Sequence, residues 1–247
     1  MPATGNREPK MNADATEILD QLQRSAAAGY KKILINHGAT EPVLGVKISE
    51  LKKIQKQIKK DYALSRELFE TGVYDAQYLA GLIADESRMT KKDLRRWLAK
   101  ANCMAISGTA VAWVAAESRY GHELALDWID AKQENAALAG WTTLGCLVSL
   151  QEDEALDLAE LRQLLRRVAK TIHQQPNQAR YAMNQFVACV GAYVSDLTAD
   201  AIGAAEQMGP VSVDMGATAC AVPSAVETIQ KVQNRGAIGK KRKTARC

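Results

Sequence analysis

The chain is poor in the features that mark several common classes of protein. Aromatic residues make up only 5% of its 247 residues, and β-like alternation of polar and apolar residues is confined to the short segment 211–214. No run of about 18 apolar residues occurs, so the sequence predicts no membrane span. The N-terminal segment lacks the apolar core of a secretory signal, and residues 1–11 have the composition of a disordered terminus.

Cysteine and histidine are scarce and show no ligand spacing. None of the five cysteines belongs to a C-x-x-C pair, and their odd number argues against a disulfide framework. Three of them lie in apolar stretches and are expected in the core, whereas pairing of Cys220 with Cys247 would need an oxidising setting. We therefore expect a cytoplasmic protein without metal or cofactor. The residues concerned are Cys103, Cys146, Cys189, Cys220, Cys247, His37, His122 and His173.

The excess positive charge is concentrated at the C-terminus. The formal net charge is +4, and the tail contributes five basic residues, which leaves 27 basic against 28 acidic residues elsewhere. We expect the tail, 237–247, to be mobile, and it either contacts phosphate or acts as a solubilising end. The candidate phosphate-binding residues in the tail are Lys240, Lys241, Arg242 and Lys243.

The rest of the chain reads as a series of short helices. Alanine and leucine dominate the apolar content, and the apolar positions recur at helical spacing. Within 61–107 three short amphipathic helices follow one another, and such helices must stack to bury their apolar faces. Segments 103–116 and 135–150 are apolar all round, which predicts burial on both sides. The sequence therefore predicts an all-α solenoid over 12–208, with a loop and a last helix over 209–236 packed on it.

Three predicted helices carry basic stripes on one face. Such a stripe is either a solvated face or a surface that follows a nucleic-acid backbone. If the stripes converge on one concave surface, a DNA partner is favoured; if they scatter over the convex side, a protein scaffold is favoured. The stripes are Lys52, Lys56 and Lys59; Lys92, Arg96 and Lys100; and Arg162, Arg166 and Lys170.

An ordered string of residues points to a family. It contains Gly45-Val46 before a basic helix, then Leu68 to Gly72, Asp75-Ala76 and Leu79 to Asp85. In this order the string resembles the bacterial DNA alkylation repair glycosylases of the AlkD-like type. The resemblance covers 45–101 well and extends more loosely to about residue 194. It implies a right-handed superhelix of HEAT-like helical pairs whose basic concave face holds duplex DNA.

The resemblance also implies a reaction, hydrolysis of the N-glycosidic bond of N3- or N7-alkylated purines. A carboxylate near the deoxyribose would stabilise the developing positive charge and position a water, with aromatic rings around it. The family has Trp-x-x-x-Asp at this point, but here Cys103 stands in place of the tryptophan and Ser107 in place of the aspartate. A serine supplies no negative charge at neutral pH.

Other expected elements of the active site are also missing. No arginine or lysine lies between Gln133 and Leu161, where the family has a catalytic arginine and this chain has Ala139, Gly140 and Trp141. The second cleft tryptophan is absent, and that segment offers only Tyr181, Phe186 and Tyr193. Trp113, Trp128 and Trp141 have apolar neighbours, which favours core packing over a cleft.

The nearest downstream carboxylate is Glu117. We expect it to be an exposed glutamate at a helix end, and a relocated catalytic carboxylate is the alternative. The sequence thus favours a monomeric protein that binds duplex DNA, with weak, altered or absent alkylpurine glycosylase activity. A solenoid scaffold that binds another protein is the alternative from a different class.

Overall fold

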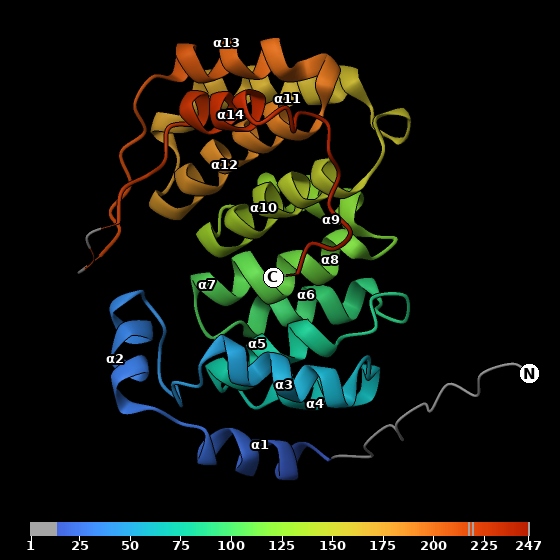
Figure 1. Ribbon diagram of the computed structural model, residues 1–247, viewed down its shortest axis with the longest axis vertical. Coiled ribbons are helices and arrows are strands. Elements are labelled where there is room, and N and C mark those ends of the chain that lie inside the picture. The colour runs from blue at the N-terminus through green and yellow to red at the C-terminus, as the bar shows by residue number, and fades with distance from the viewer. Residues whose placement is uncertain (1–13, 217, 219, 247) are drawn as a thin grey trace, which may run out of the picture.

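The computed structural model describes residues 14–216, 218 and 220–246. In this part of the chain every regular element is a helix, and no strand occurs. Figure 1 shows the helices stacked along one axis, from α1 at one end to α13 at the other. The prediction of an all-α solenoid is confirmed. Residues 1–11 and Cys247, for which we predicted disorder and a possible disulfide, lie outside the described residues.

The helices are α1 Ala15–Arg24, α2 Ala28–Asn36, α3 Ile48–Ile58, α4 Tyr62–Glu70, α5 Tyr74–Ile83, α6 Lys91–Lys100, α7 Met104–Ile106, the π-helix η1 Ser107–Val111, α8 Ala112–Glu117, α9 Gly121–Ile129, α10 Glu134–Leu150, η2 Asp153–Ala155, α11 Leu158–Thr171, η3 Ile172–Gln174, α12 Asn177–Tyr193, η4 Ser195–Leu197, α13 Thr198–Met208 and α14 Ala225–Asn234.

The helices form two rows. The inner row runs α3, α5, η1 with α8, α10, α12 and α14, and each member packs on the next. The outer row runs α1, α4, α6, α9, α11 and α13, and its members pack on the inner helices. Because each helix touches mainly its neighbours along the stack, a side chain's row decides which surface of the solenoid it reaches.

The sequence explains which helices occupy which row. Every residue of α5 is buried, and α10 is buried along almost its whole length, as expected for helices without a polar face. By contrast, α6 and α11 bury one apolar stripe and expose their charged residues. The predicted burial on both sides is confirmed for nearly all of 135–150 and for 110–116, whereas 103–105, Gly108 and Thr109 are only partly buried.

Local capping chemistry sets several helix starts. A capping box opens α6: the Thr90 hydroxyl accepts from the Asp93 amide, and the Asp93 carboxylate accepts from the Thr90 amide. Helix α1 ends at Arg24, where the Ser25 hydroxyl donates to the Gln21 carbonyl.

Segment 211–214 is not a strand. The Asp214 amide donates to the side chain of Asn177 at 2.7 Å, and that side chain donates back to the Asp214 carbonyl, so no ladder forms. Among the described helices none is individually long and apolar enough to cross a membrane; Asn177–Tyr193 and Ser195–Met208 reach that measure only as a pair, which is bent by 119°.

Candidate nucleic-acid interface

The two positions that correspond to the family's catalytic pair lie where the inner row turns from α7 into η1. Cys103 caps α7 and Ser107 opens η1. Ser107 is 0% exposed, and its hydroxyl donates to the Cys103 carbonyl at 3.4 Å. A serine in this position holds the local helix and cannot reach a ligand in the surrounding solvent.

Cys103 does not replace the missing charge. Burial raises the pKa of its thiol, although nearby backbone amides lower that pKa in part. The thiol is therefore protonated at neutral pH and is a weak nucleophile. Neither position supplies the negative charge that glycosidic-bond cleavage needs.

The C-terminal tail is fastened to the body over residues 239–246, contrary to our expectation of a mobile tail. Residues 239–246, which we call the strap, leave α14 and run across the ends of α12, α10 and α8 toward the end of α5 (Figure 1). The Gly239 amide donates to the Ala192 carbonyl at 3.0 Å, and the Arg242 amide donates to the Ser149 carbonyl at 2.7 Å. The strap is thus fastened by its backbone to two successive inner helices.

Two basic side chains of the strap bind the carboxyl ends of these helices. Lys241 Nζ donates to the carbonyls of Tyr193 at 2.7 Å and Val148 at 3.0 Å, and it lies 2.7 Å from Asp153 Oδ1. The last carbonyls of a helix have no intrahelical partner and carry a partial negative charge. A lysine that bridges two helix ends satisfies both requirements, so Lys241 serves the fold and not a ligand.

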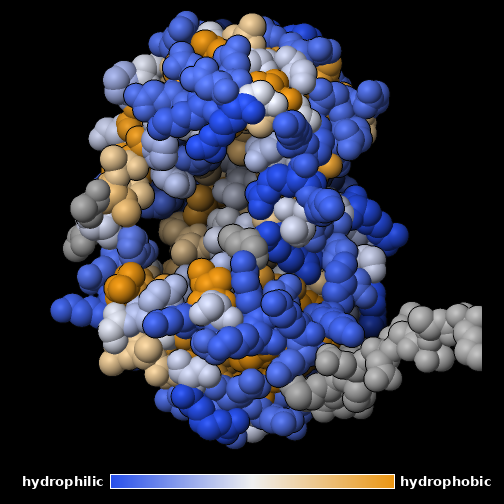
Figure 2. Space-filling model, in the orientation of Figure 1, coloured by the Kyte–Doolittle hydropathy of each residue, from blue (hydrophilic) through white to orange (hydrophobic). Residues whose placement is uncertain are grey.

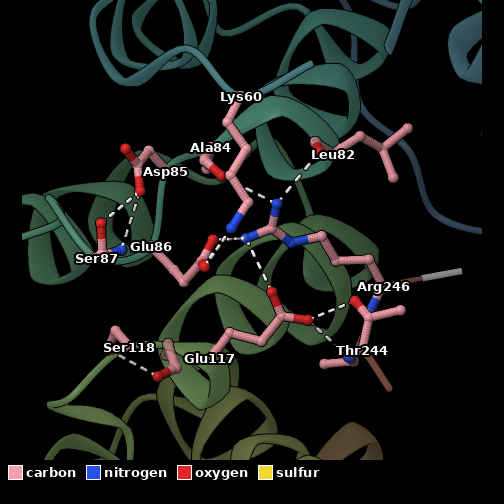
Figure 3. Close-up of polar contacts among 12 residues, drawn as sticks. Lys60, Leu82, Ala84, Asp85, Glu86, Ser87, Glu117, Ser118, Thr244 and Arg246 are labelled. Carbon is pink, nitrogen blue, oxygen red and sulfur yellow. Dashed lines mark hydrogen bonds and ion pairs between the residues drawn. The ribbon is translucent and has the colours of Figure 1, made fainter. Parts of the chain in front are cut away.

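Arg246 is held in the same way at the other end of the strap. Its Nη1 donates to the carbonyls of Ala84 at 2.9 Å and Leu82 at 3.2 Å (Figure 3). Its Nη2 lies 2.7 Å from Glu86 and 3.0 Å from Glu117, so the guanidinium joins α5 to α8.

Glu117 is therefore not the exposed helix-end glutamate that we expected. It closes α8, its side chain is only 15% exposed, and it accepts from the Thr244 hydroxyl and the Ala245 amide. The strap covers this carboxylate, which argues against its use as a relocated catalyst. Glu86, the other carboxylate bound to Arg246, is partly buried, and this burial raises its pKa. Lys60 and Arg246 lower the pKa by more, so the pKa of Glu86 lies below its usual value.

An open groove of about 920 Å³ lies beside the strap, across the carboxyl ends of the inner helices. Seven basic side chains and two acidic ones line it, and both acidic ones are bound to Arg246. Figure 2 shows that the face carrying the strap is largely hydrophilic. The groove is thus a positively charged surface suited to a phosphate backbone. Its charged residues are Lys56, Lys59, Lys60, Glu86, Glu117, Arg119, Arg242, Lys243 and Arg246.

The structure does not bring the three predicted stripes together. Lys56 and Lys59 of α3 line the groove with Arg242 and Lys243 of the strap, whereas the stripes of α6 and α11 lie on the outer row. The amphipathic pattern identified the polar face of each helix correctly. The three stripes do not converge because their helices belong to different rows, and by the criterion given above this outcome favours a protein scaffold over DNA.

The outer-row stripes take part in ion pairs between successive helices. Arg96 and Lys100 of α6 bind Glu70 of α4, and the Arg96 hydrogen bond lowers the pKa of Glu70 to about 2. Arg162 of α11 binds Asp200 of α13 at 3.0 Å. Two further ion pairs join α6 to α9, namely Lys91 with Glu123 and Arg95 with Asp127. All of these ion pairs link neighbouring helices of the outer row.

The tryptophans belong to the core, as predicted. Trp113 packs edge-on against Tyr78, and Trp141 packs against Phe186. The two remaining aromatic residues of α12, Tyr181 and Tyr193, are only partly exposed.

The histidines also serve the structure. His122 lies 2.7 Å from Glu160, and His173 lies 2.7 Å from the Met208 carbonyl. Among the described residues no group of three histidine, cysteine or acidic side chains could hold a metal ion.

Sequence reasoning missed Lys60, Arg119 and Glu86 as members of the groove. One signal was available, because Glu117 closes a helix where a negative charge is unfavourable. Such a residue requires a cation from elsewhere, and the basic C-terminal tail supplies it.

Residues 18–227 match the family model described as DNA alkylation repair enzyme. The chain belongs to this family. The predicted resemblance is confirmed, and the family holds even though Cys103 and Ser107 stand where its catalytic pair was expected.

Individual relatives agree with the family assignment. Uncharacterized proteins from Listeria innocua and Listeria monocytogenes are each 30% identical over 220 residues, covering 87% of this chain and 95% of theirs. A solved structure superposes with a TM-score of 0.88 at 35% identity, covering 95% of this chain and 100% of its own. It is described as one of a new family of proteins related to the HEAT-like repeat DNA glycosylases with affinity for branched DNA structures. The HEAT-like solenoid of the family is thus the fold of this chain.

Proposed function

We propose that this protein binds DNA through the basic groove and does not excise alkylated bases. The observation that carries the proposal is the groove itself, where Arg246 pairs with both acidic side chains and six further basic side chains line the surface. A surface of this charge favours a polyanion, and the family assignment and the affinity of the solved relative for branched DNA structures support DNA as that polyanion.

The absence of base excision follows from the chemistry at η1. Cleavage of the glycosidic bond develops positive charge on the sugar, which an enzyme stabilises with a carboxylate. Ser107 is neutral and buried, the Cys103 thiol is protonated, and Glu117 is covered by the strap. No residue at these positions offers a carboxylate to a bound nucleotide.

Branched DNA is the form of ligand that the comparison favours. The solved structure at 35% identity is described by affinity for branched DNA structures, and it spans nearly the whole chain. We extend that preference to this protein as part of the proposal. A branched probe is accordingly compared with a linear duplex of the same length in the charge-reversal test below.

Two observations favour the alternative, a scaffold that binds another protein. The stripes of α6 and α11 lie on the outer row and do not converge with that of α3. Helix α2 has no buried residue, and it exposes Ile33 at 49% and Ile35 at 42%. Exposed apolar side chains of this size are suited to a protein partner. Failure of the unaltered protein to bind either DNA probe at low salt would leave this alternative as the better account.

Charge reversal in the groove tests the proposal. We expect the double variant Lys56→Glu and Lys59→Glu to bind DNA roughly 100-fold more weakly at low salt, and to lower the salt slope by about 2, because two phosphate contacts are lost. The measurement is fluorescence anisotropy of labelled duplex and branched probes across a salt series.

The matched control reverses two charges on the outer row. Lys92→Glu with Lys170→Glu changes the net charge equally, and we expect an affinity within about twofold of the unaltered protein at moderate salt, where distant charges are screened. Equal losses in both double variants would contradict a groove-specific interface, as would no loss in the groove variant.

A further inference from the structure

The strap contains two kinds of basic residue with different surroundings. The side chains of Lys241 and Arg246 are only 9% and 7% exposed, and both are occupied by carbonyls and carboxylates of the body. Arg242 and Lys243 are exposed and line the groove. The buried pair flanks the exposed pair in sequence, so each exposed side chain lies between two anchors.

Arg246 is unavailable to a ligand. Its two terminal nitrogens contact Leu82, Ala84, Glu86 and Glu117, and Figure 3 shows the guanidinium enclosed by these groups. Any effect of Arg246 on DNA affinity must therefore act through other residues. This makes it possible to separate positioning from direct contact by substitution.

The charge of the groove depends on the strap. Without the strap, the groove would keep four basic residues, but Glu86 and Glu117 would lose the cation that joins them. The carboxyl ends of α5, α10 and α12 would also lose the side chains that now bind their carbonyls. Negative helix ends and two carboxylates repel phosphate, so this surface would become much less attractive to DNA.

We infer that the strap forms one side of the polyanion-binding groove and contributes to binding. Arg246 and Lys241 are positioning residues, which hold Arg242 and Lys243 in place to contact the polyanion. The inference rests on the proposed function and adds where the positive charge comes from. Docking of the strap and binding of DNA are then coupled, since the same contacts that hold the strap also mask the two glutamates. Loss of the anchor releases the strap and weakens DNA binding together.

Two substitutions release the strap in different ways. Arg246→Ala removes the anchor, and Thr244→Glu places a carboxylate against Glu117, to which the Thr244 hydroxyl now donates. Thr244 is exposed, so the second variant keeps the experiment informative if Arg246→Ala fails to fold. The controls are Thr244→Ser, which keeps the hydroxyl, and Arg235→Ala, which removes an exposed charge just after α14 and outside the groove.

Each variant is measured in two ways. Limited trypsin digestion reports release of the strap without any DNA, and anisotropy with a labelled duplex reports affinity at low salt. For both release variants we expect strap cleavage to accelerate and DNA affinity to fall about tenfold, the equivalent of about 1.4 kcal/mol. We expect both controls to remain within about twofold of the unaltered protein, well under that energy.

The outcomes separate the two proposals. Faster strap cleavage with unchanged DNA affinity overturns this inference and leaves the groove proposal standing on the α3 lysines. Unchanged strap cleavage in both release variants also overturns it, because the anchors would then not hold the strap. No DNA binding by the unaltered protein overturns the proposed function and this inference with it.

Discussion

Ser107→Asp, which restores the residue that the family resemblance expects, is predicted to destabilise the protein and to create no glycosylase. Ser107 is 0% exposed, and its hydroxyl donates to the Cys103 carbonyl. A carboxylate there would be buried facing a carbonyl oxygen, without a cation. The cost of such an uncompensated charge is about 3–5 kcal/mol, which lowers the melting temperature by roughly 10 °C in a chain of this size.

The pH dependence of this loss identifies its cause. Burial without a cation raises the pKa of the introduced aspartate above its value in the unfolded chain. The folded state then holds the proton more tightly, so stability relative to the unaltered protein is retained at low pH and lost as pH rises through neutrality. Thermal melts at acidic and neutral pH should therefore differ more for Ser107→Asp than for Ser107→Ala. A fully stable aspartate variant that releases 7-methylguanine would contradict this account of η1.

Asp75→Ala is predicted to have a stability effect of similar size. Asp75 is 0% exposed in the first turn of α5, and its carboxylate accepts from the amides of Leu44 at 2.6 Å, Gly45 at 3.2 Å and Val46 at 2.7 Å. Alanine would leave three largely buried amides without acceptors. At about 1–3 kcal/mol for each unsatisfied group, partly offset by relaxation, we expect a loss of about 3–5 kcal/mol.

A second aspartate provides the control for this variant. Asp85 lies just after α5, and its carboxylate accepts from the amide and hydroxyl of Ser87 in an exposed turn. Asp85→Ala should cost less than about 1 kcal/mol by urea denaturation. If the two alanine variants lose equal stability, the carboxylate of Asp75 is not what holds the loop between α2 and α3.

These contacts explain why the sequence was informative about the family but not about its chemistry. Gly45 adopts a positive φ of 84°, and a side chain there would meet the backbone of Lys31 at 2.5 Å. Asp75 fixes the same loop, and Gln77 binds the carbonyls of Phe69 and Lys100. The ordered string that revealed the resemblance thus contains residues that fix the loop before α3, and most of its other members, such as Leu68, Leu79 and Ile83, are buried in the core. Such a string predicts the fold independently of whether the catalytic pair is present.

The stripes show a limit of amphipathic patterns. A helix with Lys52, Lys56 and Lys59 on one side and a helix with Arg162, Arg166 and Lys170 on one side have the same sequence signature. Which row of the solenoid each helix joins depends on packing between repeats, and both rows have a surface in contact with solvent. The pattern therefore identified the polar faces and could not place them on one surface.

The strap shows a second limit. Lys241 contacts Val148 across 93 residues, and Arg246 contacts Leu82 across 164 residues. Local composition predicts a mobile basic tail, because no periodicity within the tail reports partners so far away in the chain. The position of Glu117 at the C-terminal end of a helix, where a negative charge is unfavourable, was the one feature that predicted a nearby cation. This feature can be recognised only when the boundaries of the helix are known.

The most direct test of the central claim is one titration with DNA that carries 7-methylguanine. Under single-turnover conditions, with protein in excess, binding and base release are measured on the same samples. The account predicts salt-sensitive binding in the micromolar range or tighter, and release no faster than in protein-free DNA. Release that rises with the bound fraction would contradict it, since an unrecognised carboxylate would then have to act in the complex.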